Sequence, residues 1–292
     1  MKRAGEGEAG MILVNVLMFV AIASGLVLLL INREELALDR ALRTREAARA
    51  LAVVRGGELS AVVALRRDMV VAPNEDNLTE PWARLSESGA PIEGGTFDLA
   101  IADAEGRFNL NALRAGDAGA IVLFQTIAKD VGLSPDDAVK AITYVRLYGP
   151  ITDIRPLRLA GLDPEATARL ERLVTALPGT TTINLNAADP DMLRILFRDP
   201  LAAQRLAEIR KRNGKLILKD LSDQNLALPW GTSFRSGTFW VRTRATIGGT
   251  SQQAAVLIQR VQHTDGKIAV GVVERWRGAS RPPEAPAFVA GR

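Results

Sequence analysis

The stretch MILVNVLMFVAIASGLVLLLI, residues 11–31, follows Gly10 directly and carries no charged side chain. A helix of this length spans roughly 31 Å, which matches the hydrocarbon core of a bilayer. An ordinary secretory signal has a shorter apolar region, and its small-residue cleavage site comes after that region. Here the small residues Ala9 and Gly10 lie before the apolar run. We therefore predict a single membrane-spanning helix that remains part of the mature protein.

Charged residues near this span predict its orientation. Lys2 and Arg3 precede it, and basic residues beside a span favour the cytoplasmic side. Glu6 and Glu8 dilute the local charge, but only Lys and Arg carry this rule. The predicted topology is a cytoplasmic N-terminus, with everything that follows the span outside the cytoplasm.

The composition is that of a globular chain. Of the 292 residues, 47% are hydrophobic and 24% are charged, which is not typical of a disordered protein. Cysteine is absent, so neither a disulfide nor a thiolate metal ligand is available. The net charge is only +4 and no basic block dominates, so the sequence does not imply strong binding to polyanions.

The helical pattern continues after the span. Residues 32–69 place leucines and valines at helical intervals among charged residues, which indicates an amphipathic helix. The pair Gly56-Gly57 is expected to weaken or bend it by about 1 kcal/mol per glycine. Two interpretations stay open: the helix packs on its own globular domain, or it also stacks on neighbouring subunits in a filament.

The remaining segments alternate between strand and helix patterns. We predict a loop at 73–95, a hairpin around Ala104-Glu105-Gly106, helices through 117–226, three strands at 237–247, 252–262 and 267–276, and a mobile tail after them. Gly248-Gly249 and Asp265-Gly266 supply the turns between the last three strands. Strands therefore flank a helical block of roughly a hundred residues, which suggests an insertion into an α+β domain.

Residues that could carry catalysis are sparse. The single histidine, His263, falls at a predicted hairpin turn, where a solvated side chain is the ordinary interpretation. No nucleophile elbow, phosphate-binding loop, zinc-helix motif or dinucleotide glycine pattern occurs. Asp98, Asp103 and Glu105 cluster near one hairpin, and Asp136-Asp137 lies in a helix first turn, where the helix dipole favours acids. We therefore predict neither an enzyme nor a cofactor.

Residues 183–221 resemble a helix-hairpin-helix unit. In DNA-binding versions, a Gly-hydrophobic-Gly turn lets backbone N–H groups meet a phosphate. Here the turn reads Phe197-Arg198-Asp199-Pro200, without glycine and with an aspartate that repels phosphate. A basic face is nevertheless conceivable from Arg205, Arg210, Lys211, Arg212 and Lys215. We interpret the unit as a packing module; the alternative function is a membrane-anchored nucleic-acid-binding protein of the DNA-uptake type.

The junction between Gly10 and Met11 resembles the cleavage site of type IV prepilins. The stretches EPWARL, GGTFDLAIADAEGRFNLNAL and TALPGTTTINLNAADPDML make residues 8–276 similar to the minor pseudopilin K (GspK) family of type II secretion systems. Its most specific signatures here are the two asparagine motifs, Phe108 to Asn111 and Ile183 to Asn186. Locally, such asparagines cap backbone groups at strand ends and helix starts.

The resemblance implies a fold class: α+β, pilin-like, with a long N-terminal transmembrane α-helix, an antiparallel sheet, and an inserted all-α, helix-hairpin-helix-like domain. The implied segments are a prepilin leader at 1–10, a membrane span at 11–31, the periplasmic half of the helix at 32–72, a pilin-like domain from 73–112 and 230–276, an inserted helical domain at 113–229, and a flexible tail at 277–292.

The resemblance also implies a function. A prepilin peptidase would cut before Met11 and methylate it, leaving a single-pass protein of the bacterial inner membrane with a periplasmic C-terminal domain. The implied role is at the pseudopilus tip, where the protein helps to initiate and cap the filament. The implied partners are minor pseudopilins of the I and J types, the major pseudopilin, the prepilin peptidase and the inner-membrane secretion platform.

Two departures from the pilin pattern are informative. The fifth mature residue, a glutamate in major pilins, is the neutral Asn15, as in the K family, which fits the end of a filament better than its repeating body. The family usually has a calcium-associated acidic loop after a helix like AITYVRLYG. Here Tyr144 to Asp153 offers one carboxylate, whereas calcium requires six to eight oxygens. We expect that loop, and its calcium, to be absent.

Overall fold

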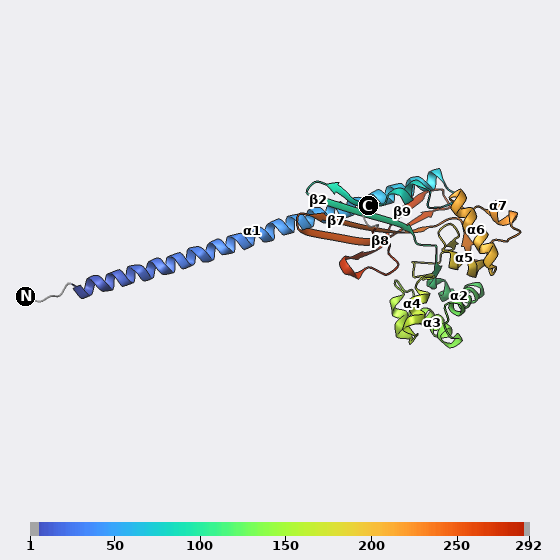
Figure 1. Ribbon diagram of the computed structural model, residues 1–292, viewed down its shortest axis with the longest axis horizontal. Helices are drawn as coiled ribbons and strands as arrows, with labels where there is room; N and C mark the ends of the chain where they lie inside the picture. The colour runs from blue at the N-terminus through green and yellow to red at the C-terminus, as the bar shows by residue number, and fades with distance from the viewer. Residues whose placement is uncertain (1–5, 289–292) are drawn as a thin grey trace, which may run out of the picture.

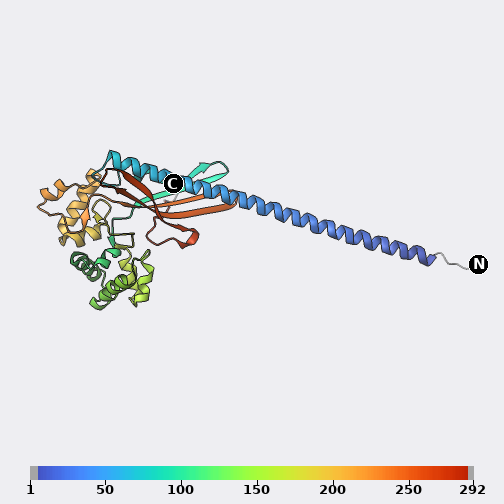
Figure 2. The same ribbon diagram turned by 180° about the vertical axis from the view of Figure 1, so that it is seen from behind.

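A single helix dominates the shape of the molecule (Figure 1). The computed structural model describes residues 6–288, and α1 (Glu6–Val71) accounts for 66 of them. At 1.5 Å per residue this helix is about 100 Å long. Figure 2 shows that its last part lies against a sheet while its first part extends away from the globular body. The first five residues of the predicted leader lie outside the described part of the chain.

The sheet has five antiparallel strands in the order β1-β2-β7-β8-β9. They are β1 (Glu87–Ile92), β2 (Gly95–Asp103), β7 (Thr238–Ile247), β8 (Thr250–Gln262) and β9 (Ile268–Arg277). The last three form consecutive hairpins, as predicted from the glycine turns. Gly248 and Gly266 adopt φ values of 56° and 79°, which L-residues rarely adopt.

The second half of α1 buries one stripe against this sheet. Ala61, Leu65 and Met69 pack with Phe239 and Trp82 in a common core, and the two aromatic rings meet edge to face at 5.0 Å. Gly56-Gly57 does not interrupt the helix, and the expected weakening or bend stays a prediction. A Cβ atom on Gly57 would lie 2.7 Å from the ring of Phe97, so this glycine lets the helix approach the strands closely.

The helical part is inserted between two paired strands. Asp103 at the end of β2 faces Phe239 of β7, and the N–H of Ala104 donates to the carbonyl of Thr238 at 3.1 Å. The chain thus leaves and re-enters the sheet at adjacent positions. Its elements are β3 (Phe108–Asn109), η2 (Leu110–Ala115), α2 (Ala118–Asp130), α3 (Pro135–Tyr148), η3 (Arg155–Ala160), α4 (Pro164–Leu170), β4 (Val174–Thr175), β5 (Ile183–Asn184), α5 (Pro190–Phe197), α6 (Pro200–Asn213), α7 (Leu218–Asp223) and β6 (Thr232–Ser233).

Most helices of the insertion begin at an oxygen-bearing side chain that caps the first turn. Ser134, for example, accepts a hydrogen bond from the N–H of Asp137. In every such helix the residue after the cap is Pro or Ala. The other such caps are Asp117, Asp163, Asp189 and Asp199. The helices enclose a core of their own, centred on residues such as Phe124, Leu157 and Leu193.

Three local predictions were wrong. The segment 73–95, predicted as loop, contains η1 (Pro81–Arg84) and the edge strand β1, whose ESGAPI sequence shows no apolar alternation. The hairpin around Ala104-Glu105-Gly106 does not form, because β2 pairs with β1 and β7 while β3 pairs in parallel with β4. The chain therefore leaves the sheet after residue 103, earlier than the predicted insert boundary.

The tail after β9 is not wholly mobile as predicted. It forms the short η4 (Gly278–Ser280) and then packs back on the protein, where Pro282 and Ala285 are buried. Residues 289–292 lie outside the described part of the chain.

The two asparagine motifs build equivalent turns. Asn109 accepts a hydrogen bond from the N–H of Asn111 at 3.1 Å, and Asn184 accepts one from Asn186 at 2.9 Å, as local capping predicts. Both motifs also make long-range bonds. The Asn111 amide donates to the carbonyls of Ile151 and Leu177, each at 2.8 Å, and accepts from the N–H of Ile151 at 2.9 Å.

Replacing Asn111 with alanine is expected to destabilise the insertion strongly. The change removes three hydrogen bonds to buried backbone groups and leaves the N–H and carbonyl of Ile151 without this partner, while the Leu177 carbonyl keeps the Asn109 amide at 3.3 Å. The expected loss of unfolding free energy is about 3 kcal/mol. Chemical denaturation of the detergent-solubilised protein measures it. The control is Asn213→Ala, an exposed position where a change within about 0.5 kcal/mol is expected. Equal stability of the two variants would contradict the assigned role of Asn111.

Candidate functional site

Between Leu13 and Ile31, α1 is predominantly apolar, and all of its side chains there are exposed. Leu17, Phe19 and Leu29 are each at least 60% exposed, so this part has the length and composition of a membrane span. Gly10 and Met11 lie near the start of the helix, and Asn15 lies one turn further on within it. The structure places these predicted processing residues at the far end from the globular body.

An apolar groove runs beside the last turns of α1. Leu59 and Val63 of α1 form one wall, and Pro81 and Leu85 of the η1 segment form the other. Its volume is about 690 Å³. Leu59 is 63% exposed and Val63 59% exposed, although they belong to the same helix that buries Ala61 and Leu65 in the core. This face of α1 is therefore available for contact with another apolar surface.

A buried ion-pair network closes the inner side of this groove. Asp68 of α1 accepts a hydrogen bond from Arg260 of β8 at 2.8 Å, and Asp76 in the following loop pairs with the same guanidinium. Glu80 lies nearby and accepts from the indole of Trp82 at 2.7 Å. Burial, together with the charge of Asp68, raises the pKa of Glu80 to about 7.

Asp68, Asp76 and Glu80 are the acidic side chains within residues 6–288 that bring three oxygens within 4.8 Å of one another. Their arrangement does not indicate a cation site. Arg260 occupies the position of a cation between two of them, and the third is saturated by Trp82 and Asn77. The cluster is therefore a structural ion pair.

Asp76 also ties the insertion to the sheet. Its carboxylate accepts from the N–H of Ser236 at 2.7 Å, and its carbonyl accepts from the side chain of Asn184 at 3.0 Å. Its own N–H donates to the carbonyl of Phe234 at 2.8 Å. Every hydrogen-bonding group of this one residue is thus used to hold α1, β8 and the insertion together.

A second pair of acids lies where the insertion joins β2. Asp103 accepts from Ser236 at 2.6 Å and from Asn184 at 2.8 Å, and burial raises its pKa. Burial and the neighbouring Asp103 raise the pKa of Glu105 to about 8. Glu105 is therefore protonated at neutral pH, which removes the repulsion between two adjacent buried charges.

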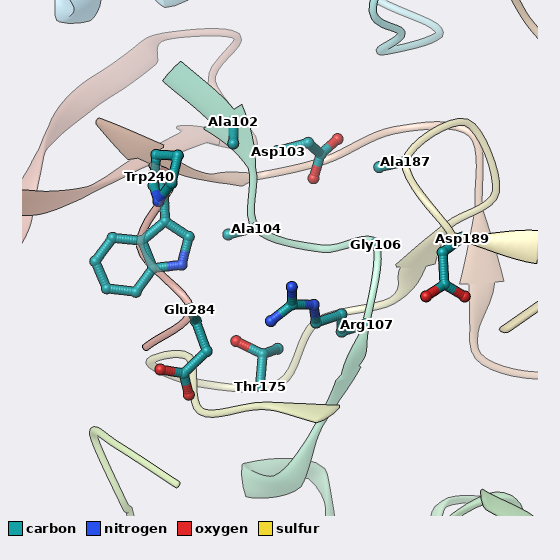
Figure 3. Close-up of a pocket in the computed structure, with 11 residues that line it drawn as sticks. Ala102, Asp103, Ala104, Gly106, Arg107, Thr175, Ala187, Asp189, Trp240 and Glu284 are labelled. Carbon is teal, nitrogen blue, oxygen red and sulfur yellow. The ribbon is translucent and has the colours of Figure 1, made fainter. Parts of the chain in front are cut away.

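A polar cavity of about 250 Å³ lies beside this junction (Figure 3). In the view of Figure 3, Trp240 and Glu284 lie on one side, Asp189 lies on the other, and Arg107 lies between them. The indole N–H of Trp240 is buried and finds no acceptor among the described residues. Both carboxylate oxygens of Glu284 are likewise buried without a donor from another described residue.

The region of the family's calcium loop does not fit a calcium ion. Asp153, the one carboxylate predicted there, accepts from the N–H of Arg155 at 2.8 Å and from its guanidinium at 2.5 Å. Its oxygens therefore face an arginine rather than an open position, and calcium prefers several uncompensated oxygens. That this loop binds no calcium stays a prediction.

The α5–α6 hairpin does not offer a phosphate site. Asp199 accepts from the N–H groups of Leu201 at 2.9 Å and Ala202 at 3.1 Å, so the helix start is already occupied by a carboxylate. Arg210 donates to the carbonyls of Leu185 and Ala188. Arg205 donates to the side chain of Gln224, and Lys215 forms an ion pair with Glu75. The predicted basic face is therefore largely committed to internal contacts.

His263 lies exposed in the β8–β9 turn, as predicted, where its N–H and carbonyl close the hairpin. Asp98 on β2, between β1 and β7, accepts from Arg244 at 2.8 Å, and Asp137 accepts from the Ser134 hydroxyl that caps its helix. These acids serve structural roles, and the structure does not bring them together with the histidine.

None of the known family models matches the sequence. Type II secretion system protein K of Pseudomonas aeruginosa is 28% identical over 94% of this chain and 94% of its own length. Its namesake from Klebsiella pneumoniae is 26% identical over 93% of this chain and 97% of its own length. Over nearly its whole length the chain is similar to the type II secretion system protein K of both organisms. It is accordingly a minor pseudopilin, and the suspected GspK resemblance is confirmed.

The protein K fold is confirmed by a solved structure. A chain of the GspK-GspI-GspJ complex from the enterotoxigenic Escherichia coli type 2 secretion system matches with a TM-score of 0.61. The match is 21% identical and covers 82% of this chain and 100% of that one. The predicted α+β, pilin-like class with a long helix, an antiparallel sheet and inserted helices is therefore correct. Nothing in these comparisons favours the nucleic-acid-binding alternative.

Sequence reasoning missed the Asp68–Arg260–Asp76 network. A signal for it was present. Asp68 is seven residues after Ala61, on the buried helical face, and Arg260 is two residues after Ile258, on the inward face of β8. Opposite charges on two facing buried surfaces indicate an ion pair.

Proposed function

We propose that this protein stands at the tip of a type II secretion pseudopilus and helps to initiate and cap it. It is anchored by one pass through the bacterial inner membrane, with a cytoplasmic N-terminus and a periplasmic globular part. The observation that carries the proposal is that the two halves of α1 have different surroundings. Its first half is an exposed apolar span, and its second half buries one face in the sheet while presenting the apolar groove at Leu59 and Val63.

Tip placement is supported by two further features. The insertion lies at the end of the sheet away from the free part of α1 (Figure 1), where a bulky domain leaves the packing of helices below it undisturbed. Asn15 supplies no carboxylate to neutralise the ammonium of an adjacent subunit. A subunit with these properties suits the end of a helical filament.

The proposed partners are minor pseudopilins of the I and J types, and the major pseudopilin would follow below. The structural neighbour was solved as a complex with GspI and GspJ, which supports this choice. The prepilin peptidase and the inner-membrane platform would act before and during assembly. The proposed role requires no catalysis and no cofactor.

The experiment that tests the proposal is the intact mass of the protein purified from the membranes of its own host. We expect a species that begins at Met11 with one added methyl group. The same protein from a strain lacking prepilin peptidase is the control and should retain residues 1–10. A full-length mass from cells with active peptidase would overturn the assignment to a processed pseudopilin.

A further inference from the structure

The chain after β9 crosses from the sheet to the insertion and contacts both. Ala285 is 4% exposed and packs among Trp240 of the sheet and Leu177 of the insertion. Arg242 donates to the carbonyl of Pro286 at 3.2 Å, and its guanidinium lies 4.0 Å from the ring centroid of Phe288. We refer to residues 281–288 as the C-terminal strap.

The strap has a local turn near its start and ring contacts at its end. At its start, the N–H of Ala285 donates to the carbonyl of Pro282 at 3.2 Å, which forms a turn. At its end, Phe288 lies over two arginines of β7, the second being Arg244 at 4.7 Å. Cation–π contacts at such sites stabilise weakly, which is enough to hold a short segment but not to lock it.

Glu284 sits between these anchors and faces the cavity of Figure 3. Both its oxygens are buried, and no other described residue donates a hydrogen bond to them. The charged groups that face it come from several elements. They are Arg107 before β3, Asp153 and Arg155 beside η3, Glu171 after α4, and Asp103 and Asp189 across the cavity.

The surroundings of Glu284 therefore contain more acids than bases. Asp153 is already paired with Arg155, and Arg107 donates to the backbone carbonyl of Glu171 at 3.4 Å rather than to Glu284. A carboxylate that receives no hydrogen bond from another residue is costly to bury, and its neutral form is less so. Docking of the strap thus favours the protonated acid.

We propose that the C-terminal strap is a proton-controlled latch between sheet and insertion, with Glu284 as the group whose protonation closes it. Burial, followed by the charge of Asp153, raises the pKa of Glu284 to about 7 from an ordinary 4.5. An acid whose pKa is raised in the docked state favours docking at low pH. That preference is fully present below pH 4.5 and is lost as the pH rises to about 7.

The consequence is mechanical. With the strap docked, Ala285 joins the core that Trp240 and Leu177 share, so the sheet and the insertion are held from two sides. With the strap released, the insertion keeps the Asp76 and Asp103 connections but loses this third one. The latch would let the pH outside the cytoplasm adjust how firmly the insertion is held.

The test is amide hydrogen exchange of the strap in the full-length protein in lipid nanodiscs. Rates are divided by the intrinsic rate at each pH, which gives a protection factor for the strap peptide. We expect that factor to fall about 50-fold between pH 5.0 and pH 7.5, because one proton is released on opening. Strand β8 serves as the internal reference and should stay protected at both pH values.

Two variants decide the origin of the effect. Glu284→Gln keeps the shape of the side chain without titrating, so its strap should stay protected with a change below about threefold over the same range. Glu274→Gln is the matched control, since the pKa of Glu274 on β9 is also raised by burial, and it should behave as the wild type. A pH-independent wild-type strap, an equal response in Glu284→Gln, or loss of the response in Glu274→Gln would overturn the proposal. A Glu284→Gln strap that is open at every pH would also overturn it.

Discussion

Replacing Asp76 with alanine is expected to lower the free energy of unfolding by about 3–5 kcal/mol, a large part of the stability of a typical domain. The Asp76 side chain is fully buried and that of Arg260 is 2% exposed, so the guanidinium would lose one of its two carboxylates in a buried site. The N–H of Ser236 would lose its acceptor in the same step. Both losses add to the cost of the cavity left behind.

Denaturant unfolding of the detergent-solubilised protein, followed by tryptophan fluorescence, measures this effect. Trp82 reports on the region directly, because it packs on Phe239 and donates to Glu80 within the same cluster. The matched control is Asp265→Ala, which removes an exposed carboxylate from the β8–β9 turn and should change stability by less than about 0.5 kcal/mol. If Asp76→Ala were as stable as this control, the network would not hold the fold together.

The expected loss comes from breaking one side of the ion pair, not from the strength of the pair itself. Buried ion pairs stabilise little compared with apolar residues of similar size, whereas breaking one side leaves an uncompensated charge. The Asp76 site differs from such a pair, because its backbone groups also bond Phe234 and Asn184. Those backbone bonds would persist in Asp76→Ala, so the loss of stability isolates the side chain.

The parts of the fold that sequence predicted best rest on local patterns. The membrane span, the two glycine-turn hairpins and the capped helices each follow from residues within one or two turns of one another. The predicted hairpin at Ala104–Gly106 failed because the strand partner of β2 lies beyond the whole insertion, at Phe239. Local alternation identifies a strand but not the strand with which it pairs.

At the candidate sites, too, the sequence predicted local contacts but not contacts between distant parts of the chain. The capping role of Asn109 and Asn184 followed from the sequence, but their bonds to Leu177 and Asp76 depend on tertiary packing. Gly57 was expected to weaken α1, and its role in close packing against Phe97 required the structure. Glu284 lay in a segment predicted as mobile, because a Pro- and Ala-rich tail shows no periodicity even when it packs.

Replacing Leu59 with glutamate is expected to abolish assembly while leaving the protein folded. The side chain is 63% exposed in the groove beside α1, so the free subunit tolerates a charge there within about 0.5 kcal/mol. In an assembled tip, a neighbouring helix would bury the new carboxylate without a partner. A cost of about 3 kcal/mol would weaken the contact on the order of 100-fold. Val63→Glu, 59% exposed on the same face, should act in the same way.

The measurement is co-purification of the I-type and J-type minor pseudopilins with the full-length protein from host membranes, together with secretion by the same cells. Leu201→Glu is the matched control, because Leu201 is equally apolar and 66% exposed but lies on α6 of the insertion. We expect this control to assemble and secrete normally. Assembly by Leu59→Glu at the wild-type level would show that the groove is not a subunit contact and would move the search to another face of α1. Failure of Leu201→Glu alongside it would instead implicate the insertion in the same interface. The structure favours normal assembly of this control, because Leu201 is not among the residues that line the groove.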